Sequence, residues 1–121
     1  MPSTKDHAEV SAGVTLTAGA GDTTIASQDN TTSYGGAWQL RLTNGATGPT
    51  VPAQIQIQVS PDDTEWFDLG GPLVAGTAND GVYEWTVVID HAFQYTRGLA
   101  GSNTGQDVTL QADYSKMTHN R

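Results

Sequence analysis

The sequence has no cysteine and few basic residues. The absence of cysteine excludes structural disulfides and zinc sites built from thiolates. Only five lysines and arginines stand against 13 acidic residues, which gives a net charge of −8. These five cations are scattered along the chain, at Lys5, Arg41, Arg97, Lys116 and Arg121. Because a nucleic-acid-binding surface usually carries a basic stripe, we expect neither nucleic acid nor an anionic membrane among the partners.

Long apolar runs are also missing. No segment approaches the roughly 20 apolar residues of a membrane span. Residues 1–9 lack the apolar core of a secretory signal. We therefore expect a protein that is made in the cytoplasm and stays soluble. No stretch of about 11 residues repeats with a helical period, so the apolar residues must be arranged in another way.

Apolar and polar residues instead alternate with a period of two, which is the pattern of a half-buried β-strand. In residues 53–59, Ile55, Ile57 and Val59 alternate with glutamines. Similar alternation covers residues 38–42, 83–89, 93–99 and 108–114. Gly, Pro, Asn and Asp cluster between these segments. The sequence predicts an all-β fold, either an antiparallel β-sandwich or a jelly-roll-like barrel of about seven to eight short strands.

The same alternation predicts which side chains face the core. In residues 93–99 it places Phe93, Tyr95, Arg97 and Leu99 together on the apolar face. Most of the other aromatic residues are in phase with Leu, Ile and Val, so we expect them in the core as well. Tyr34 is different, because it lies in the polar loop 27–36. Its context suggests an exposed ring.

The pattern also suggests how the chain is divided. Residues 1–12 are polar and show no clear period, which is typical of an N-terminal arm. Residues 13–115 hold all the alternating segments and are expected to form a single domain. Residues 116–121 are expected to be a polar tail.

No catalytic pattern is present in the sequence. His7, His91 and His119 are far apart and share no metal-ligand spacing. The acidic cluster at 62–65 lacks the spacing of a calcium loop and is typical of a turn. There is no nucleophile elbow and no phosphate-binding loop. We therefore expect no enzyme, no metal and no cofactor.

Two stretches of the C-terminal half carry a resemblance. Residues 58–70, QVSPDDTEWFDLG, resemble a hairpin that is common in β-sandwich modules of phage virions, in decoration, head-fibre and tail proteins. Galactose-binding-like domains use a similar hairpin. Residues 93–110 resemble the pattern that often closes the same phage domains. The turn departs from the commoner form, because it contains Pro61 and lacks a glycine after Asp63.

This resemblance implies a capsid decoration (cement) protein. Such a protein binds the major capsid protein on the exterior of the virion and stabilises the shell. The resemblance also favours a homo-oligomer, for which we expect a homotrimer with cyclic symmetry. The candidate capsid contacts lie in the N-terminal arm. They are Pro2, Lys5, His7, Glu9 and Val10.

Two alternatives fit the same resemblance. One is a carbohydrate-binding or adhesin-type module of a head fibre or tail. In that case Tyr34 and the loops 27–36 and 72–81 are the expected ligand contacts. The other is a tail-tube or connector subunit that assembles into rings.

Overall fold

The computed structural model describes residues 3–90 and 92–119, and this part of the chain is built from nine β-strands. Their bounds are β1 (Ser3–Leu16), β2 (Thr23–Asp29), β3 (Gly36–Asn44), β4 (Gln54–Ser60), β5 (Phe67–Asp68), β6 (Leu73–Val74), β7 (Val82–Ile89), β8 (Tyr95–Gly101) and β9 (Val108–His119). No helix long and apolar enough to cross a membrane occurs in these residues.

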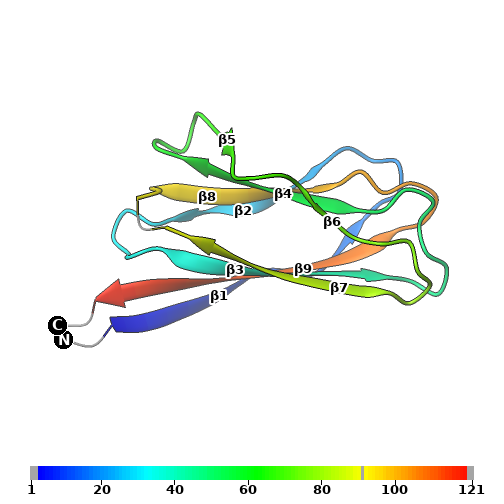
Figure 1. Ribbon diagram of the computed structural model, residues 1–121, viewed down its shortest axis with the longest axis horizontal. Coiled ribbons are helices and arrows are strands. Elements are labelled where there is room, and N and C mark those ends of the chain that lie inside the picture. The colour runs from blue at the N-terminus through cyan, green and yellow to red at the C-terminus, as the bar shows by residue number, and fades with distance from the viewer. Residues whose placement is uncertain (1–2, 91, 120–121) are drawn as a thin grey trace.

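The strands form two antiparallel sheets that pack face to face (Figure 1). The first sheet has the order β1-β9-β3-β7, and the second has the order β2-β8-β4-β5, with β6 also paired to β4. Strand β1 pairs with β9, β2 with β8, β3 with β7, and β4 with β5 and β6. The chain is therefore one long hairpin rolled into two sheets, which is jelly-roll topology. The predicted fold class is confirmed.

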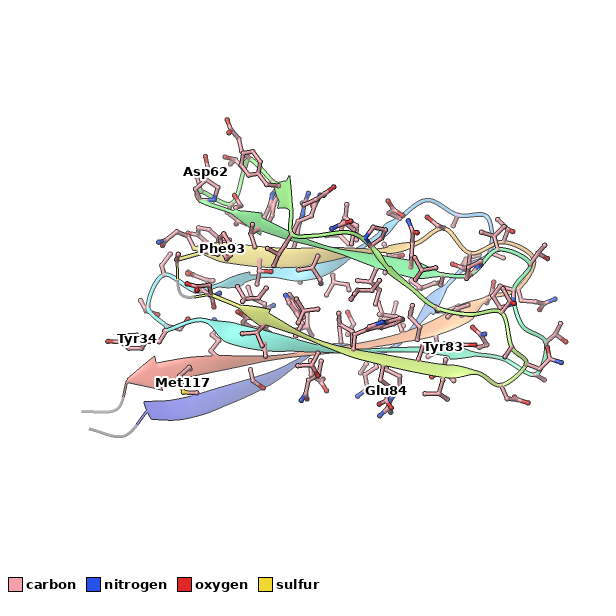
Figure 2. The ribbon with its side chains drawn as sticks, in the orientation of Figure 1. Tyr34, Asp62, Tyr83, Glu84, Phe93 and Met117 are labelled. Carbon is pink, nitrogen blue, oxygen red and sulfur yellow. The ribbon has the colours of Figure 1, made fainter. Side chains whose placement is uncertain are left out.

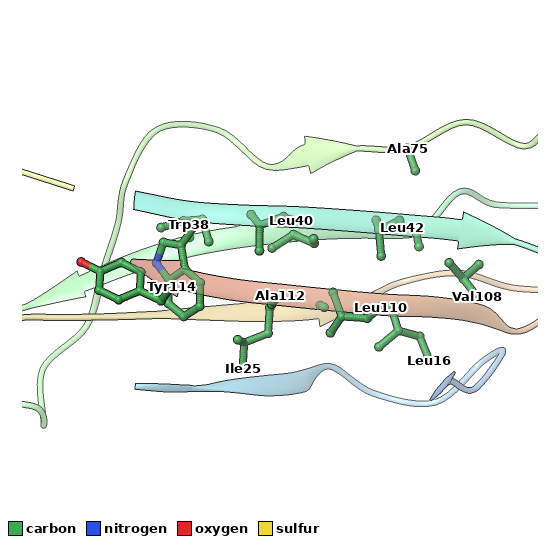
Figure 3. Close-up of a cluster of buried hydrophobic side chains, with 14 of the residues drawn as sticks. Leu16, Ile25, Trp38, Leu40, Leu42, Ala75, Val108, Leu110, Ala112 and Tyr114 are labelled. Atoms are coloured by element: carbon green, nitrogen blue, oxygen red, sulfur yellow. The ribbon is translucent and has the colours of Figure 1, made fainter. Parts of the chain in front are cut away.

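The core lies between the two sheets and is built from the inward residues of each strand (Figure 3). In β4 the expected alternation holds, because Ile55 and Ile57 are buried while the glutamines between them are not. Trp38 of β3 and Tyr114 of β9 are both fully buried, and their ring centroids lie 4.8 Å apart. The indole Nε1 of Trp38 donates a hydrogen bond to the Thr96 hydroxyl at 3.0 Å, so the polar edge of this large ring is satisfied.

The predicted core face of the segment 93–99 was wrong for the strand itself. In β8 Thr96, Gly98 and Ala100 are buried, as is the final Gly101, whereas Tyr95, Arg97 and Leu99 lie on the other face. Small residues face inward here because the neighbouring strands fill the space. A Cβ atom at Gly98 would lie 2.9 Å from Cδ1 of Ile25. Phe93 precedes the strand and packs against the core, as expected.

The two chain ends are joined to the first sheet along their described length. Strand β1 begins at Ser3, inside the segment expected to be an arm, and β9 continues to His119, inside the expected tail. The two strands pair without a register shift from Ser3–His119 to Glu9–Asp113. Strand β3 joins β9 only from Lys116 inward, so the pair β1–β9 extends past the sheet as a two-stranded ribbon (Figure 1). We call residues 3–5 and 117–119 the terminal ribbon.

Candidate interaction surfaces

In the acidic turn 60–65, side-chain oxygens accept hydrogen bonds from backbone N–H groups of the turn. The carboxylate of Asp62 accepts hydrogen bonds from the backbone N–H groups of Thr64 and Glu65, both at 3.0 Å. These bonds hold the pKa of Asp62 at about 2, below its usual range. The Ser60 hydroxyl oxygen accepts from the N–H groups of Asp62 and Asp63. This is the turn role that the sequence indicated.

No metal centre emerges from the described residues, among which no group of three or more His, Asp or Glu side chains could hold an ion. His91 lies outside these residues, and the side chains of His7 and His119 are also outside them.

An apolar groove lies at the base of the terminal ribbon, on the outer face of the first sheet. It has a volume of about 330 Å³, and its apolar lining includes Tyr34, Ala37, Val88 and Met117. Tyr34 is 56% exposed and Val88 is 75% exposed. The N–H of Tyr34 donates to the Met117 carbonyl at 2.6 Å, which fixes the loop against β9. Tyr34 and Met117 lie at the same end of the molecule (Figure 2).

Gly36 lines this groove and allows β3 and β9 to approach closely beside it. At this position β3 passes so close to β9 that a Cβ atom would clash with the Ser115 carbonyl oxygen and lie 2.7 Å from the Tyr114 ring. A glycine at this position therefore lets the two strands approach closely.

The candidate capsid contacts take different positions in the structure. Lys5, His7 and Glu9 are backbone members of β1, paired with Met117, Ser115 and Asp113. Pro2 lies outside the described residues.

Val10 is not part of a free arm. It lies between the paired residues Glu9 and Ser11, where the register shifts, and its side chain is half-buried against the core. The side chain contributes to packing of the sandwich, and its role as a capsid contact stays a prediction.

The structure does not bring together Tyr34 and the loop 72–81, which were expected to share one ligand site. Tyr34 precedes the first residue of β3, whereas the loop 76–81 is bonded to Asn44, the last residue of that strand. A strand of this length separates the two by roughly 25–30 Å. The loop 72–81 and Tyr34 thus lie at opposite ends of the sandwich.

A polar and aromatic strip on the outer face of the second sheet was not foreseen. The guanidinium of Arg97 lies 4.2 Å from the ring centroid of Trp66. Its Nε donates to the Gln58 amide oxygen at 2.9 Å, and the Gln58 amide nitrogen donates to Asp68 at 3.0 Å. The strip runs across β5, β4 and β8. The outward phase of Gln58 was visible in the sequence, but Arg97 had been assigned to the opposite face.

Searches with the sequence find no matching family model and no matching curated protein. The fold, in contrast, matches many solved structures. One is the VP2 subviral particle of infectious bursal disease virus, with 9% identity and a TM-score of 0.61 over 97% of this chain and 33% of that chain. Another is the SPBc2 prophage-derived protein YomS, with 12% identity and a TM-score of 0.56 over 98% of this chain and 96% of that one.

A third match is a family 16 carbohydrate-binding module, with 14% identity and a TM-score of 0.50 over 88% of this chain and 76% of that one. At these identities the similarity shows a shared fold. This chain spans only about a third of the viral capsid chains that it matches. It spans almost the whole of the prophage protein.

Proposed function

We propose that this chain is a non-enzymatic structural protein of a virion and that it decorates the outer surface of a capsid, where it binds the major capsid protein. The observation that carries the proposal is the apolar groove at the base of the terminal ribbon. Tyr34 and Val88 are exposed there, and large apolar groups on a surface usually mark a contact site. Jelly-roll domains are common in capsid proteins, which supports the proposal.

The mechanism is adhesion. The ribbon is a continuation of the paired strands β1 and β9, so it is held in place before binding and loses little conformational entropy on contact. The groove supplies apolar area next to it. The net charge of −8 favours a basic patch on the capsid as the complementary surface. A protein bound in this way stabilises the shell by bridging neighbouring subunits.

The experiment compares two variants in a sedimentation assay with capsids of the virus that encodes the chain, purified without it. Tyr34→Asp places a charge in the groove, and the matched control Val74→Asp places one on an exposed residue of β6. We expect wild type and Val74→Asp to sediment with the capsids and Tyr34→Asp to remain largely in the supernatant. If wild type itself fails to bind, capsid decoration is wrong. If Tyr34→Asp and Val74→Asp bind the capsids equally well, the groove does not contact the capsid.

A second function is favoured by the strip on the second sheet. Trp66 offers an aromatic face, and Gln54, Gln56 and Gln58 line the same outer side of β4 with amide groups. Aromatic stacking together with amide hydrogen bonds suits a carbohydrate, and the fold also occurs in a carbohydrate-binding module. A glycan array tests this directly. Saturable binding that Trp66→Ala abolishes supports it, and an array without binding contradicts it.

A further inference from the structure

Strand β7 forms one edge of the first sheet, and in the described part of the chain it pairs with β3 alone. The register of this pair continues to Asn44, whose backbone N–H donates to the Gly81 carbonyl at 2.8 Å. Hydrogen-bonded and non-hydrogen-bonded residues alternate along an antiparallel pair. Residues 83, 85 and 87 therefore bond to β3. The backbone groups of Val82, Glu84, Thr86 and Val88 point to the open edge.

The other edge strands carry features that discourage pairing with another chain. Strand β1 has two register shifts, and its sequence includes Lys5, Asp6 and Glu9. Strand β2 is interrupted by a register shift between Ile25 and Gln28. Strands β5 and β6 have only two residues each. Strand β7 is eight residues long, has no register shift and carries one charged residue, Glu84.

Strand β7 also has the composition of a strand that pairs well. It runs for eight residues, VYEWTVVI, without a register shift, and nearly all of them are β-branched or aromatic. Its one charged residue, Glu84, forms an ion pair with Arg41 at 2.8 Å. On the outer face Val82 is 55% exposed and Val88 is 75% exposed. A long open edge with a mostly apolar sequence is a template for strand addition.

We propose that β7 pairs antiparallel with β7 of a second copy of this chain, about a twofold axis at Trp85. In this register Val82 faces Val88 of the second copy, and Glu84 faces Thr86 of the second copy. Every backbone group on the open edge then finds a partner. The two first sheets join into one continuous sheet across the dimer.

The side chains select this register over its neighbours. Residues whose backbone N–H and C=O groups face the open edge must pair with residues of the second copy whose backbone groups also face its open edge. The alternative registers therefore differ from this one by two residues. One such shift places Glu84 against Glu84 of the second copy, with like charges opposed. The other shift leaves Val82 without a partner. The register centred on Trp85 avoids both and pairs the two most exposed valines of the strand with each other.

The second copy also covers Trp85. This side chain packs against the core from the edge strand, where it is only partly buried. In the proposed dimer it lies beside Trp85 of the second copy on the inner face. A second copy of β7 thus supplies hydrogen-bond partners for the open edge and side chains that match it. For this reason the sequence of β7 fits a second copy of this chain rather than a different protein.

Cysteine cross-linking tests the register, because the native chain has no cysteine. Residues paired across the axis lie at about 5.5 Å between Cα atoms, which suits a disulfide. We expect a mixture of Val82→Cys and Val88→Cys to form a disulfide-linked dimer under mild oxidation. Either variant alone should not. Cross-linking of one variant with itself, or none in the mixture, overturns the proposed pairing.

Charge substitutions test the dimer in solution by sedimentation velocity over a range of concentrations. Thr86→Glu opposes Glu84 of the second copy on both sides of the axis and should weaken the dimer about tenfold, whereas Thr86→Lys should leave it intact or tighten it. Gln111→Glu adds the same charge on β9, two strands away from the edge, and should not change the dimer. Circular dichroism verifies that each variant is folded.

The oligomeric state of the chain in solution supports or overturns the proposed β7 dimer. A concentration-dependent dimer that is weakened by Thr86→Glu alone supports the proposal. A wild-type chain that is monomeric at all concentrations, or a trimer, overturns it. Equal weakening by Thr86→Glu and Thr86→Lys assigns a different register and overturns the axis at Trp85. Capsid binding is measured separately with Tyr34→Asp, so either proposal can fail alone.

Discussion

Asn30 and Tyr114 bond to each other twice, across the interior of the sandwich. The Asn30 amide nitrogen donates to the Tyr114 hydroxyl oxygen at 2.8 Å, and the hydroxyl donates back to the amide oxygen at 3.0 Å. Both residues are buried. The pair fixes the loop after β2, which leads to Tyr34, to strand β9.

Removing the hydroxyl tests this pair. Tyr114→Phe keeps the ring but removes the acceptor of the buried Asn30 amide nitrogen, whereas the amide oxygen still accepts from the Ser33 hydroxyl. An unsatisfied buried polar group costs about 1–3 kcal/mol. We expect the free energy of unfolding to fall by about that amount in urea titrations. A change below about 0.5 kcal/mol would show that the pair contributes little to stability.

Alkaline pH tests the same residue through its ionisation. Burial raises the pKa of Tyr114 above its ordinary value of 10.0. In the unfolded chain this tyrosine loses its proton near pH 10, whereas the folded chain retains it to higher pH. Its contribution to stability is therefore complete below pH 10 and is lost as the pH rises through the folded pKa. Wild type should lose more stability than Tyr114→Phe between pH 9 and 11.

The low pKa of Asp62 gives a prediction at acidic pH. The folded-state pKa of about 2 lies below the ordinary value of 3.8. The contribution of the carboxylate is therefore present above pH 3.8 and lost as the pH falls through 2. An NMR titration of the side-chain carboxyl should give a midpoint near 2. An ordinary midpoint would mean that the hydrogen bonds from Thr64 and Glu65 do not form in solution.

Two glycine substitutions test the close approach of β3 and β9. Gly36→Ala introduces a Cβ atom that meets the Ser115 carbonyl and the Tyr114 ring. Overpacking of this kind costs about 1–3 kcal/mol, and the strands must also move apart. The matched control, Gly71→Ala, has open space around it and should be nearly neutral. Thermal unfolding of the two variants compares them, and equal melting temperatures would contradict the packing at Gly36.

The sequence was most informative where large apolar residues alternate along a strand. The inward positions of Ile55, Ile57 and Trp38 follow directly from the period of two. The same rule misassigned the face of β8, because Gly98 and Ala100 are the core residues there. The volume that they leave is filled from Ile25 on the next strand, and a single strand's pattern does not contain that information.

The candidate interaction surfaces were harder to predict from the sequence than the core, because they depend on which strands pair. Residues 3–9 have no strand pattern, yet they form a strand because β9 offers them a partner. The exposure of Tyr34 agreed with its polar loop. The strip of Trp66, Arg97 and Gln58 could not be assembled from the sequence, since its residues come from separate segments. The strand order of the second sheet brings them together.

Electron cryomicroscopy of capsids with and without this chain tests the proposed function most directly. Capsids purified without the chain are incubated with the full-length protein, and the two reconstructions are compared. We predict additional density on the outer surface of the shell that fits the two-sheet sandwich, with the terminal ribbon and Tyr34 turned toward the capsid. Identical reconstructions, or density confined to the tail, would contradict capsid decoration.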